Sequence, residues 1–310
     1  MFDIVFLGTA AAVPSAERGL PALLVAKGSS RYLIDCGEGT QQQLMRAGLG
    51  FRSVTHVLLT HAHLDHVLGL AGLLATFTLF RVNRTVEIVG SDQTIAFVRR
   101  YLAATIGPGA RDGAYRLRAV SPAPVLEEQG WRLEAFAVAH RDTESLGYRF
   151  QDEPRSSLVA ERLDALGVPE GPERAALARG QPVILADGRL IAPEMVHGAQ
   201  APGAKLAVVG DTEEVTSLIE PVRGADTLVI EATFLDRDRA LARARGHLTA
   251  ADAARLACKA DVGELLLTHI SGRYRSQEIL MEASRHFPNV RVVADFDRIS
   301  IRARDRRGSS

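Results

Sequence analysis

Short apolar runs recur along the whole chain and alternate with segments of helical periodicity. The runs are rich in Val, Ile and Leu, and most of them end at Gly, Asp, Thr or His, which is typical of buried strands. We predict strands over residues 2–7, 22–26, 31–34, 56–59, 86–89, 131–138, 206–209, 227–230, 264–267 and 290–293. Helical patterns cover residues 39–47, 91–102, 213–221 and 248–260. The alternation predicts an α/β fold, a sandwich of two sheets covered by helices.

One long stretch departs from this alternation. Residues 156–180 have a helical pattern that Gly and Pro interrupt at 167–172, and residues 181–203 are rich in turn signals such as Asp187-Gly188. The pattern is typical of an insertion that projects from a domain, although an ordinary surface excursion has the same appearance. We therefore expect a single domain formed by residues 1–150 and 204–303, an inserted arm and loop at 151–203, and a tail at 304–310.

Composition narrows the class of protein further. The chain has 310 residues, 46% of them hydrophobic, which is enough for a substantial core. Its formal net charge is zero, so the average charge supplies no argument for nucleic-acid binding. Cys36 and Cys258 lie far apart with no Cys-x-x-Cys, and we expect reduced thiols and a cytoplasmic protein, with one disulfide as the alternative. We expect no signal peptide and no membrane span.

A cluster of ionisable residues follows one of the predicted strands. The apolar run before it stops at His61-Ala62-His63-Leu64-Asp65-His66, after which residues 67–80 can begin a helix. Imidazole nitrogen and carboxylate oxygen both bind zinc, and four such groups in six residues exceed what one closed tetrahedral site takes from one segment. The density indicates two metal ions that share a loop. Histidines without a joint role are the alternative, but three His and one Asp at one strand end favour a joint role.

Further ionisable residues stand directly after other apolar runs. His140, Asp211 and His269 each follow a predicted strand, which is where α/β folds place their sites. Any one of these three residues alone would more often be an ordinary loop residue. As a set that completes the first loop, the three are better interpreted as metal ligands.

These residues resemble the ordered ligand set of the metallo-β-lactamase superfamily, and other blocks resemble its ribonuclease Z branch, the tRNA 3′-processing endonucleases. The blocks are Leu7-Gly8-Thr9, Asp35-Cys36-Gly37-Glu38-Gly39-Thr40-Gln41, Gly210-Asp211-Thr212, Glu231-Ala232-Thr233-Phe234, Gly246-His247-Leu248-Thr249 and Leu267-Thr268-His269-Ile270-Ser271-Gly272-Arg273-Tyr274. The insertion resembles the flexible arm of that family, with Gly171-Pro172 near its tip. The resemblance covers nearly the whole chain and implies an αββα sandwich with a protruding helical arm.

The resemblance also implies roles for individual residues. It assigns His61, His63 and His140 to one zinc ion, Asp65, His66 and His269 to a second, and Asp211 to a bridging position. Asp65 can orient the attacking water or accept its proton. His247, supported by Glu231, lies near the leaving oxygen in the family, where an oriented and protonated imidazole stabilises negative charge or donates a proton; a structural ion pair is the alternative. Arg273 matches phosphate geometry as a substrate contact, with a plain surface Arg as the alternative.

The activity implied by the resemblance is that of a zinc-dependent hydrolase and nuclease. Metal-activated hydroxide attacks a phosphodiester and removes the 3′ trailer from precursor tRNA. Two Zn²⁺ ions are expected, with Mn²⁺ as the alternative cation, in a cytoplasmic homodimer with no membrane partner. The segment 151–180 carries six acidic and four basic residues, a net charge of −2, which is a poor electrostatic clamp for RNA. Two alternatives therefore stay open: a two-metal hydrolase of small phosphodiesters or sulfate esters, and a non-catalytic RNA- or partner-binding protein.

Overall fold

The computed structural model describes residues 1–50, 53–80, 82, 84–107, 113–154 and 156–304. These residues divide into two compact units, a body of Met1–Asp152 and Ala204–Arg304 and an arm of Glu153–Gly203. Each unit is described by itself below.

The first sheet of the body has seven strands in the order β16-β1-β2-β3-β4-β5-β6. The strands are β1 (Phe2–Gly8), β2 (Ala22–Lys27), β3 (Ser30–Ile34), β4 (His56–Leu58), β5 (Val86–Gly90), β6 (Tyr115–Ala119) and β16 (Arg298–Ile301). Strands β3 to β6 run parallel, whereas β1 pairs antiparallel with both β2 and β16. The accompanying helices are α1 (Thr40–Arg46), α2 (Leu64–Val67), α3 (Gly69–Leu79) and α4 (Asp92–Thr105).

The second sheet also has seven strands, in the order β15-β14-β13-β12-β9-β8-β7. The strands are β7 (Pro124–Glu128), β8 (Trp131–His140), β9 (Thr143–Asp152), β12 (Lys205–Val208), β13 (Thr227–Glu231), β14 (Glu264–Thr268) and β15 (Val290–Val292). Its helical elements are α8 (Ile219–Val222), the short 3₁₀ helix η3 (Asp236–Asp238), α9 (Arg239–Arg245), α10 (Ala250–Lys259) and α11 (Ser276–Ala283).

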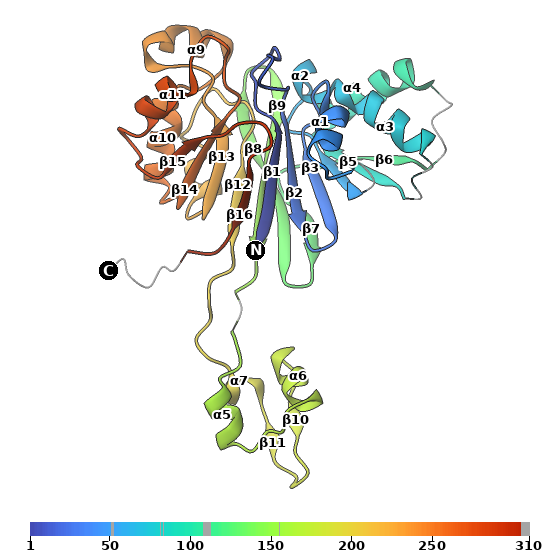
Figure 1. The fold of residues 1–310 in the computed structure, drawn as a ribbon, viewed down its shortest axis with the longest axis vertical. Coiled ribbons are helices and arrows are strands. Elements are labelled where there is room, and N and C mark those ends of the chain that lie inside the picture. The colour runs from blue at the N-terminus through green and yellow to red at the C-terminus, as the bar shows by residue number, and fades with distance from the viewer. Residues whose placement is uncertain (51–52, 81, 83, 108–112, 155, 305–310) are drawn as a thin grey trace. The chain divides into compact units, whose positions relative to one another are not determined.

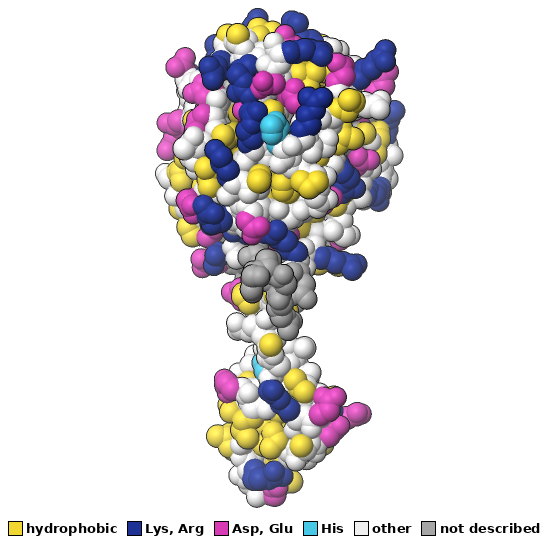
Figure 2. Space-filling model, turned by 90° about the vertical axis from the view of Figure 1, so that its left-hand side faces the viewer, with side chains coloured by type: hydrophobic (Ala, Val, Ile, Leu, Met, Phe, Trp, Pro, Cys, Tyr) yellow, Lys and Arg dark blue, Asp and Glu magenta, His cyan; other side chains and the backbone are white. Residues whose placement is uncertain are grey.

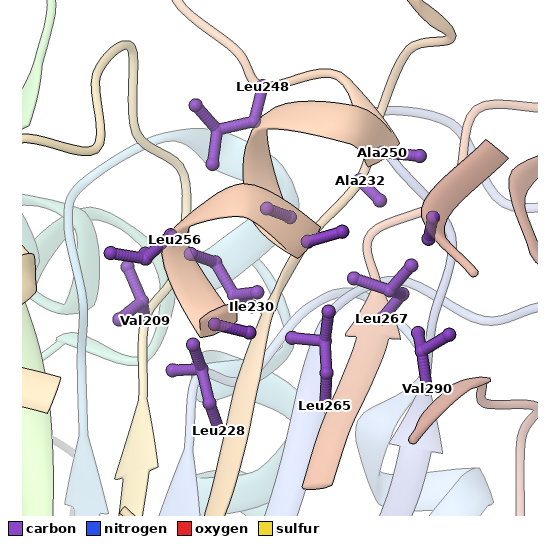
Figure 3. Packing of buried hydrophobic residues seen from close by; sticks show 14 of the residues in the cluster. Val209, Leu228, Ile230, Ala232, Leu248, Ala250, Leu256, Leu265, Leu267 and Val290 are labelled. Atoms are coloured by element: carbon purple, nitrogen blue, oxygen red, sulfur yellow. The ribbon is translucent and has the colours of Figure 1, made fainter. Parts of the chain in front are cut away.

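The two sheets pack face to face with helices on both outer surfaces, as Figure 1 shows. Apolar side chains of both sheets, such as Phe6, Tyr148 and Leu266, form the core between them. A second core lies between the first sheet and α1, α3 and α4, and a third lies between β13, β14 and α10 (Figure 3). The predicted αββα sandwich is therefore confirmed.

The arm has a small core of its own. It contains α5 (Ala160–Ala165), α6 (Pro172–Ala178), α7 (Pro193–Val196) and a two-stranded sheet of β10 (Val183–Ile184) and β11 (Leu190–Ile191). Six buried apolar side chains fill its centre: Leu163, Val168, Leu177, Leu185, Ile191 and Val196. Val196 and Leu177 are almost fully buried, so the arm folds around its own hydrophobic centre.

All ten predicted strands are present, but the pattern missed others. Strands β6, β7, β9 and β16 carry too many polar or charged residues to stand out, and the arm contains a small sheet where only loop was expected. The helix predicted over residues 213–221 is wrong in most of its length, because only α8 forms. The Glu214 carboxylate accepts hydrogen bonds from the backbone N–H groups of Thr216 and Ser217 and holds a turn instead. Within the described residues, no helix has the length and apolar character needed to cross a membrane.

Candidate metal centre

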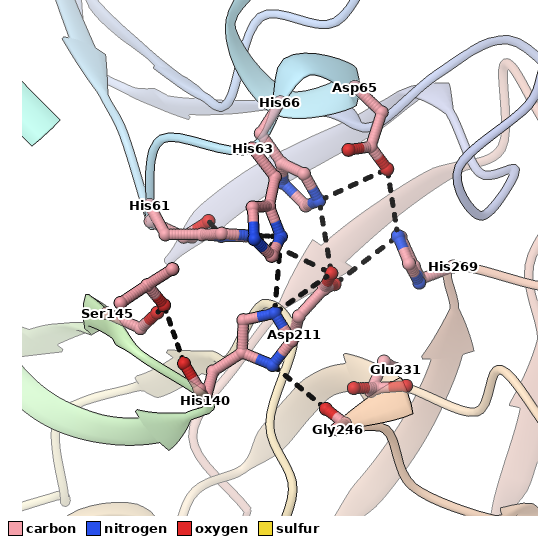
Figure 4. A network of polar contacts seen from close by, with 12 residues as sticks. His61, His63, Asp65, His66, His140, Ser145, Asp211, Glu231, Gly246 and His269 are labelled. Carbon is pink, nitrogen blue, oxygen red and sulfur yellow. Dashed lines mark hydrogen bonds and ion pairs between the residues drawn. The ribbon is translucent and has the colours of Figure 1, made fainter. Parts of the chain in front are cut away.

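The predicted ligands come from strand ends of both sheets. The loop that contains His61 and His63 follows β4 of the first sheet and leads into α2, whose first turn carries His66. His140 is the last residue of β8, and Asp211 follows β12 closely, both in the second sheet. Because the sheets face each other, these loops can meet, and Figure 4 shows that their side chains converge on Asp211. The structure thus brings together side chains that are up to about 200 positions apart, such as Asp65 and His269, whose numbers differ by 204.

One group consists of His61, His63, His140 and Asp211. His63 Nδ1 lies 2.9 Å from His61 Nε2 and 3.3 Å from His140 Nε2. Asp211 Oδ2 lies 3.7 Å from His61 Nε2 and 3.9 Å from His140 Nε2. Nitrogen ligands held ~2.1 Å from one tetrahedral zinc ion are themselves roughly 3.4 Å apart. These four ligand atoms therefore have the mutual spacing of a single cation site.

A second group consists of Asp65, His66 and His269, with Asp211 again beside it. Asp65 Oδ2 lies 3.6 Å from His66 Nε2 and 3.5 Å from His269 Nε2. Asp211 reaches both histidines, at 3.5 Å from His66 Nε2 and 3.3 Å from His269 Nε2. Asp211 thus contacts members of both groups, as a bridging carboxylate must.

The chemistry of these atoms fits a pair of divalent cations. His66 Nε2 and Asp211 Oδ1 are buried, yet neither has a hydrogen-bond partner among the described residues. Buried polar atoms are almost always paired, so two orphaned ligand-type atoms in one cluster indicate a partner of another kind. Three His with one carboxylate, and two His with one carboxylate, are donor sets that zinc accepts.

The remote nitrogen of several of these histidines is held by a second residue. His66 Nδ1 lies 2.8 Å from the buried Asp35 carboxylate, and His140 Nδ1 lies 2.8 Å from the Gly246 carbonyl oxygen. His269 Nδ1 lies 2.9 Å from the hydroxyl oxygen of Thr233. Such contacts orient the ring and leave Nε2 free for a metal ion.

The pKa shifts differ in direction among the residues of the cluster. Burial lowers the pKa of His61, His63 and His140, so these rings are neutral and carry the lone pair that a metal ion needs. Burial alone would raise the pKa of Asp211, but the neighbouring His269 and His66 hold it well below its usual value. His66 has the opposite shift: burial lowers its pKa, yet Asp211 and Asp35 raise it well above 6.5.

The predicted Glu231–His247 pair lies next to this cluster. Glu231 ends β13 and is fully buried, and its carboxylate lies 3.0 Å from His247 Nδ1. Glu231 is itself fixed by the backbone N–H of Thr212, at 2.8 Å. Burial would lower the pKa of His247, but Glu231 raises it to about 9. His247 also lies 3.9 Å from Asp211, so a protonated imidazole stands at the rim of the cluster.

Arg273 lines the cleft beside the cluster.

Several residues that orient the cluster were not predicted from the sequence. Asp35, Thr233 and Gly246 received no role, although each lies within a block that the family resemblance identified. Asp35 follows β3 directly and has a left-handed φ of 57°, which is uncommon for a residue other than Gly. Its position after a buried strand is the signal that could have identified it, because the ligands share that position.

Comparisons with known proteins agree with this architecture. The chain is 52% identical to the ribonuclease Z of Bradyrhizobium diazoefficiens, over 97% of this chain and 100% of that protein. It is 37% identical to the ribonuclease Z of Archaeoglobus fulgidus, over 96% of each chain. The family model for the β-lactamase superfamily domain matches residues 176–270, and the model for the anti-Pycsar protein Apyc1 matches residues 2–156.

Solved structures show the same fold at lower sequence identity. The short form of human tRNase Z superposes with a TM-score of 0.66 at 24% identity, covering 96% of this chain and 99% of that one. The metallo-β-lactamase fold protein YhfI from Bacillus subtilis gives a TM-score of 0.70 at 18% identity, covering 96% of this chain and 98% of that one. The resemblance drawn from the sequence is confirmed, and the chain belongs to the ribonuclease Z family of the β-lactamase superfamily.

Proposed function

We propose that the protein is a metal-dependent endoribonuclease that removes 3′ trailers from precursor tRNA. The observation that carries this proposal is the match to ribonuclease Z sequences over both full lengths. The cluster of His and Asp side chains that could hold metal ions supports it. The enzyme class follows from the family, and the residues below perform the chemistry.

In this proposal His61, His63 and His140 would hold one divalent cation, and Asp65, His66 and His269 would hold another; Asp211 lies within reach of both groups. Two divalent cations bound there would supply Lewis acidity and lower the pKa of the attacking water. Zn²⁺ is the proposed metal because imidazole-rich sites suit it, and Mn²⁺ is the alternative.

The protein side chains organise the transfer of protons. Water attacks the phosphorus while Asp65 orients it and accepts its proton, and the bond from phosphorus to the leaving oxygen breaks. His247 donates a proton to that leaving oxygen, and Glu231 keeps the imidazole oriented and protonated. Arg273 contacts a phosphate oxygen of the substrate.

The assembly and compartment belong to the same proposal. We propose a homodimer, on the strength of the family resemblance alone. A cytoplasmic location accords with the two cysteines, since Cys36 and Cys258 are both free thiols.

A second candidate function is hydrolysis of a small phosphodiester. The arm carries five Arg and no Lys against seven carboxylates, a net charge of −2. Two of those arginines are engaged within the arm, Arg174 with Asp164 and Arg189 with Asp187. Phosphate neutralisation supplies most nonspecific RNA affinity, so this observation favours the smaller substrate.

One experiment separates the two candidates. The purified protein, with its metal content measured, is incubated at low salt with a precursor tRNA that carries a 3′ trailer and, separately, with bis(p-nitrophenyl) phosphate. Cleavage at the trailer junction supports the endoribonuclease. Hydrolysis of the small diester alongside an untouched precursor moves the substrate to a small molecule, and a protein that binds no divalent metal contradicts both candidates.

A further inference from the structure

A cleft of about 490 Å³ lies beside the metal-ligand cluster and shares His63, Asp65, Asp211 and His269 with it. Its floor includes Asp65, Asp211 and His247, and its walls include three arginines, Arg141, Arg245 and Arg273. Among the described residues, the only carboxylates that line this cleft are Asp65 and Asp211, and both belong to the proposed cation site. With two divalent cations bound, the wall arginines face no uncompensated negative charge of the protein.

The three wall arginines differ in their ion pairing from the arginines on the neighbouring surface. Figure 2 shows the side of the body that carries α9, α10 and α11, where basic and acidic side chains lie next to one another. Arg237 of η3 pairs with Glu278 of α11, and Arg239 of α9 pairs with Asp252 of α10. Among the residues that the structure describes, no side-chain hydrogen bond or ion pair involves Arg141, Arg245 or Arg273.

The local backbone presents Arg141 to the cleft. Arg141 directly follows the ligand His140 and has a left-handed φ of 48°. The aliphatic part of the Arg141 side chain packs on Gly246. A Cβ added to this glycine would lie only 2.5 Å from Arg141 Cγ. Gly246 accepts the hydrogen bond from His140 Nδ1 and is preceded by Arg245, the last residue of α9. One glycine contact therefore brings Arg141 against the end of the helix that carries Arg245.

We propose that Arg141 and Arg245 form a second phosphate subsite, which binds a phosphate adjacent to the scissile one in a polynucleotide. Two unpaired guanidinium groups on one wall match the planar, multidentate geometry of phosphate oxygens. A simple diester has no second phosphate and leaves this subsite unused. The inference rests on the proposed function, because it names a polynucleotide as the substrate class of the same site.

The test compares Arg141→Ala and Arg245→Ala with Arg243→Ala as the matched control. Arg243 is an exposed arginine of the same helix α9 that does not line the cleft. The substrates are precursor tRNA and bis(p-nitrophenyl) phosphate, and metal content is measured for every variant. Each cleft variant lowers kcat/KM for precursor tRNA by roughly tenfold or more, the size expected for removal of a charged hydrogen bond, and affects the small diester far less. The log–log slope of RNA affinity against salt concentration also becomes shallower by about 0.7 for each phosphate that is no longer neutralised, and Arg243→Ala changes neither quantity.

The outcomes separate the subsite from the proposed function. Cleft variants that match Arg243→Ala overturn the subsite, and so does an equal reduction on both substrates, because that result indicates damage to the metal site. If the wild-type protein leaves precursor tRNA intact, the dinucleotide pUpU is tested as a competitor of diester hydrolysis. Weaker competition by pUpU in the two cleft variants then supports the subsite while the tRNA function fails, and unchanged competition overturns the subsite as well.

Discussion

At the scale of single residues, the site depends on which groups carry a proton. Glu231 is a fully buried carboxylate that accepts hydrogen bonds from Thr212 and Thr233 and faces His247. Such a carboxylate fixes the tautomer of His247 and raises its pKa. In the proposed mechanism, this arrangement would separate proton donation, at His247, from cation binding, at the other histidines of the cluster.

Replacing His247 by Ala tests that separation. We expect His247→Ala to retain its bound metal, because neither of the two principal ligand groups contains His247, and to lose roughly 10²- to 10⁴-fold in kcat, as expected for a missing general acid. Metal analysis and single-turnover cleavage measure the two properties. His63→Ala is the control that loses metal, and wild-type cleavage by His247→Ala would remove the general acid from the mechanism.

Glu231→Gln tests the origin of the raised pKa. In the wild-type protein the pKa of about 9 keeps His247 protonated at neutral pH, and the acid is lost only as the pH rises through that value. Removing the carboxylate charge lowers the pKa, so the protonated form is lost at a lower pH. The alkaline limb of the kcat profile should move towards neutrality, whereas an unchanged limb would assign it to another group.

At the scale of elements, the site is held by close packing of backbone against backbone. The loop after β3 lies directly on α2 and α3: a Cβ added to Gly69 would lie 2.1 Å from the Gly37 carbonyl oxygen. A Cβ added to Gly37 would lie 2.4 Å from the Asp65 carbonyl oxygen. These two glycines let the loop that carries Asp35 approach the helix turn that carries Asp65 and His66.

Gly69→Ala is therefore expected to push α3 away from this loop. We predict a loss of about 1–3 kcal/mol in the free energy of unfolding, the usual size for an overpacked site, together with weaker metal binding. Gly72→Ala is the control on the same helix, because its added Cβ would meet only the end of the Gln41 side chain, at 3.1 Å. That change is expected to be neutral or slightly stabilising. Equal unfolding curves for the two variants would exclude the packing argument.

The sequence pattern predicted some strands and helices well and missed others, for physical reasons. Buried strands such as β13 and β14 are continuous apolar runs and stand out, as do Glu231 at the end of β13 and His269 directly after β14. Strand β6, with two Arg in YRLRA, is only partly buried, so its pattern carries little signal. The contacts made by Gly246 and Arg141 depend on which loops meet in space, and no local pattern encodes that.

At the scale of the whole molecule, the arm is inserted between two strands that already pair. β9 and β12 are antiparallel, Gln151 is opposite Lys205, and the Asp152 N–H donates to the Ala204 carbonyl oxygen at 2.8 Å. The two ends of the arm are therefore neighbours in the body. Together with the separate core of the arm, this register indicates that the body can fold without it.

Deleting the arm tests its role in substrate recognition. Residues 153–203 are replaced by Asn-Gly, a pair suited to close an antiparallel hairpin. We expect the shortened protein to bind metal and hydrolyse bis(p-nitrophenyl) phosphate, and to lose roughly 100-fold or more in kcat/KM for precursor tRNA, since remote binding energy is removed. Circular dichroism and metal analysis verify the fold. Undiminished tRNA cleavage would show that the arm does not recognise this substrate.

The pairing of β1 with β16 has a consequence for biosynthesis. Phe2 is opposite Ile301, so β1 is synthesised long before β16, which is one of its two neighbours in the sheet. Until β16 arrives, the backbone N–H and C=O groups along that side of β1 remain an open edge, and such edges recruit other strands. Pairing across this sequence separation also slows folding. A nascent chain in which β16 has not yet been made therefore exposes one side of β1 to pairing with strands of other chains.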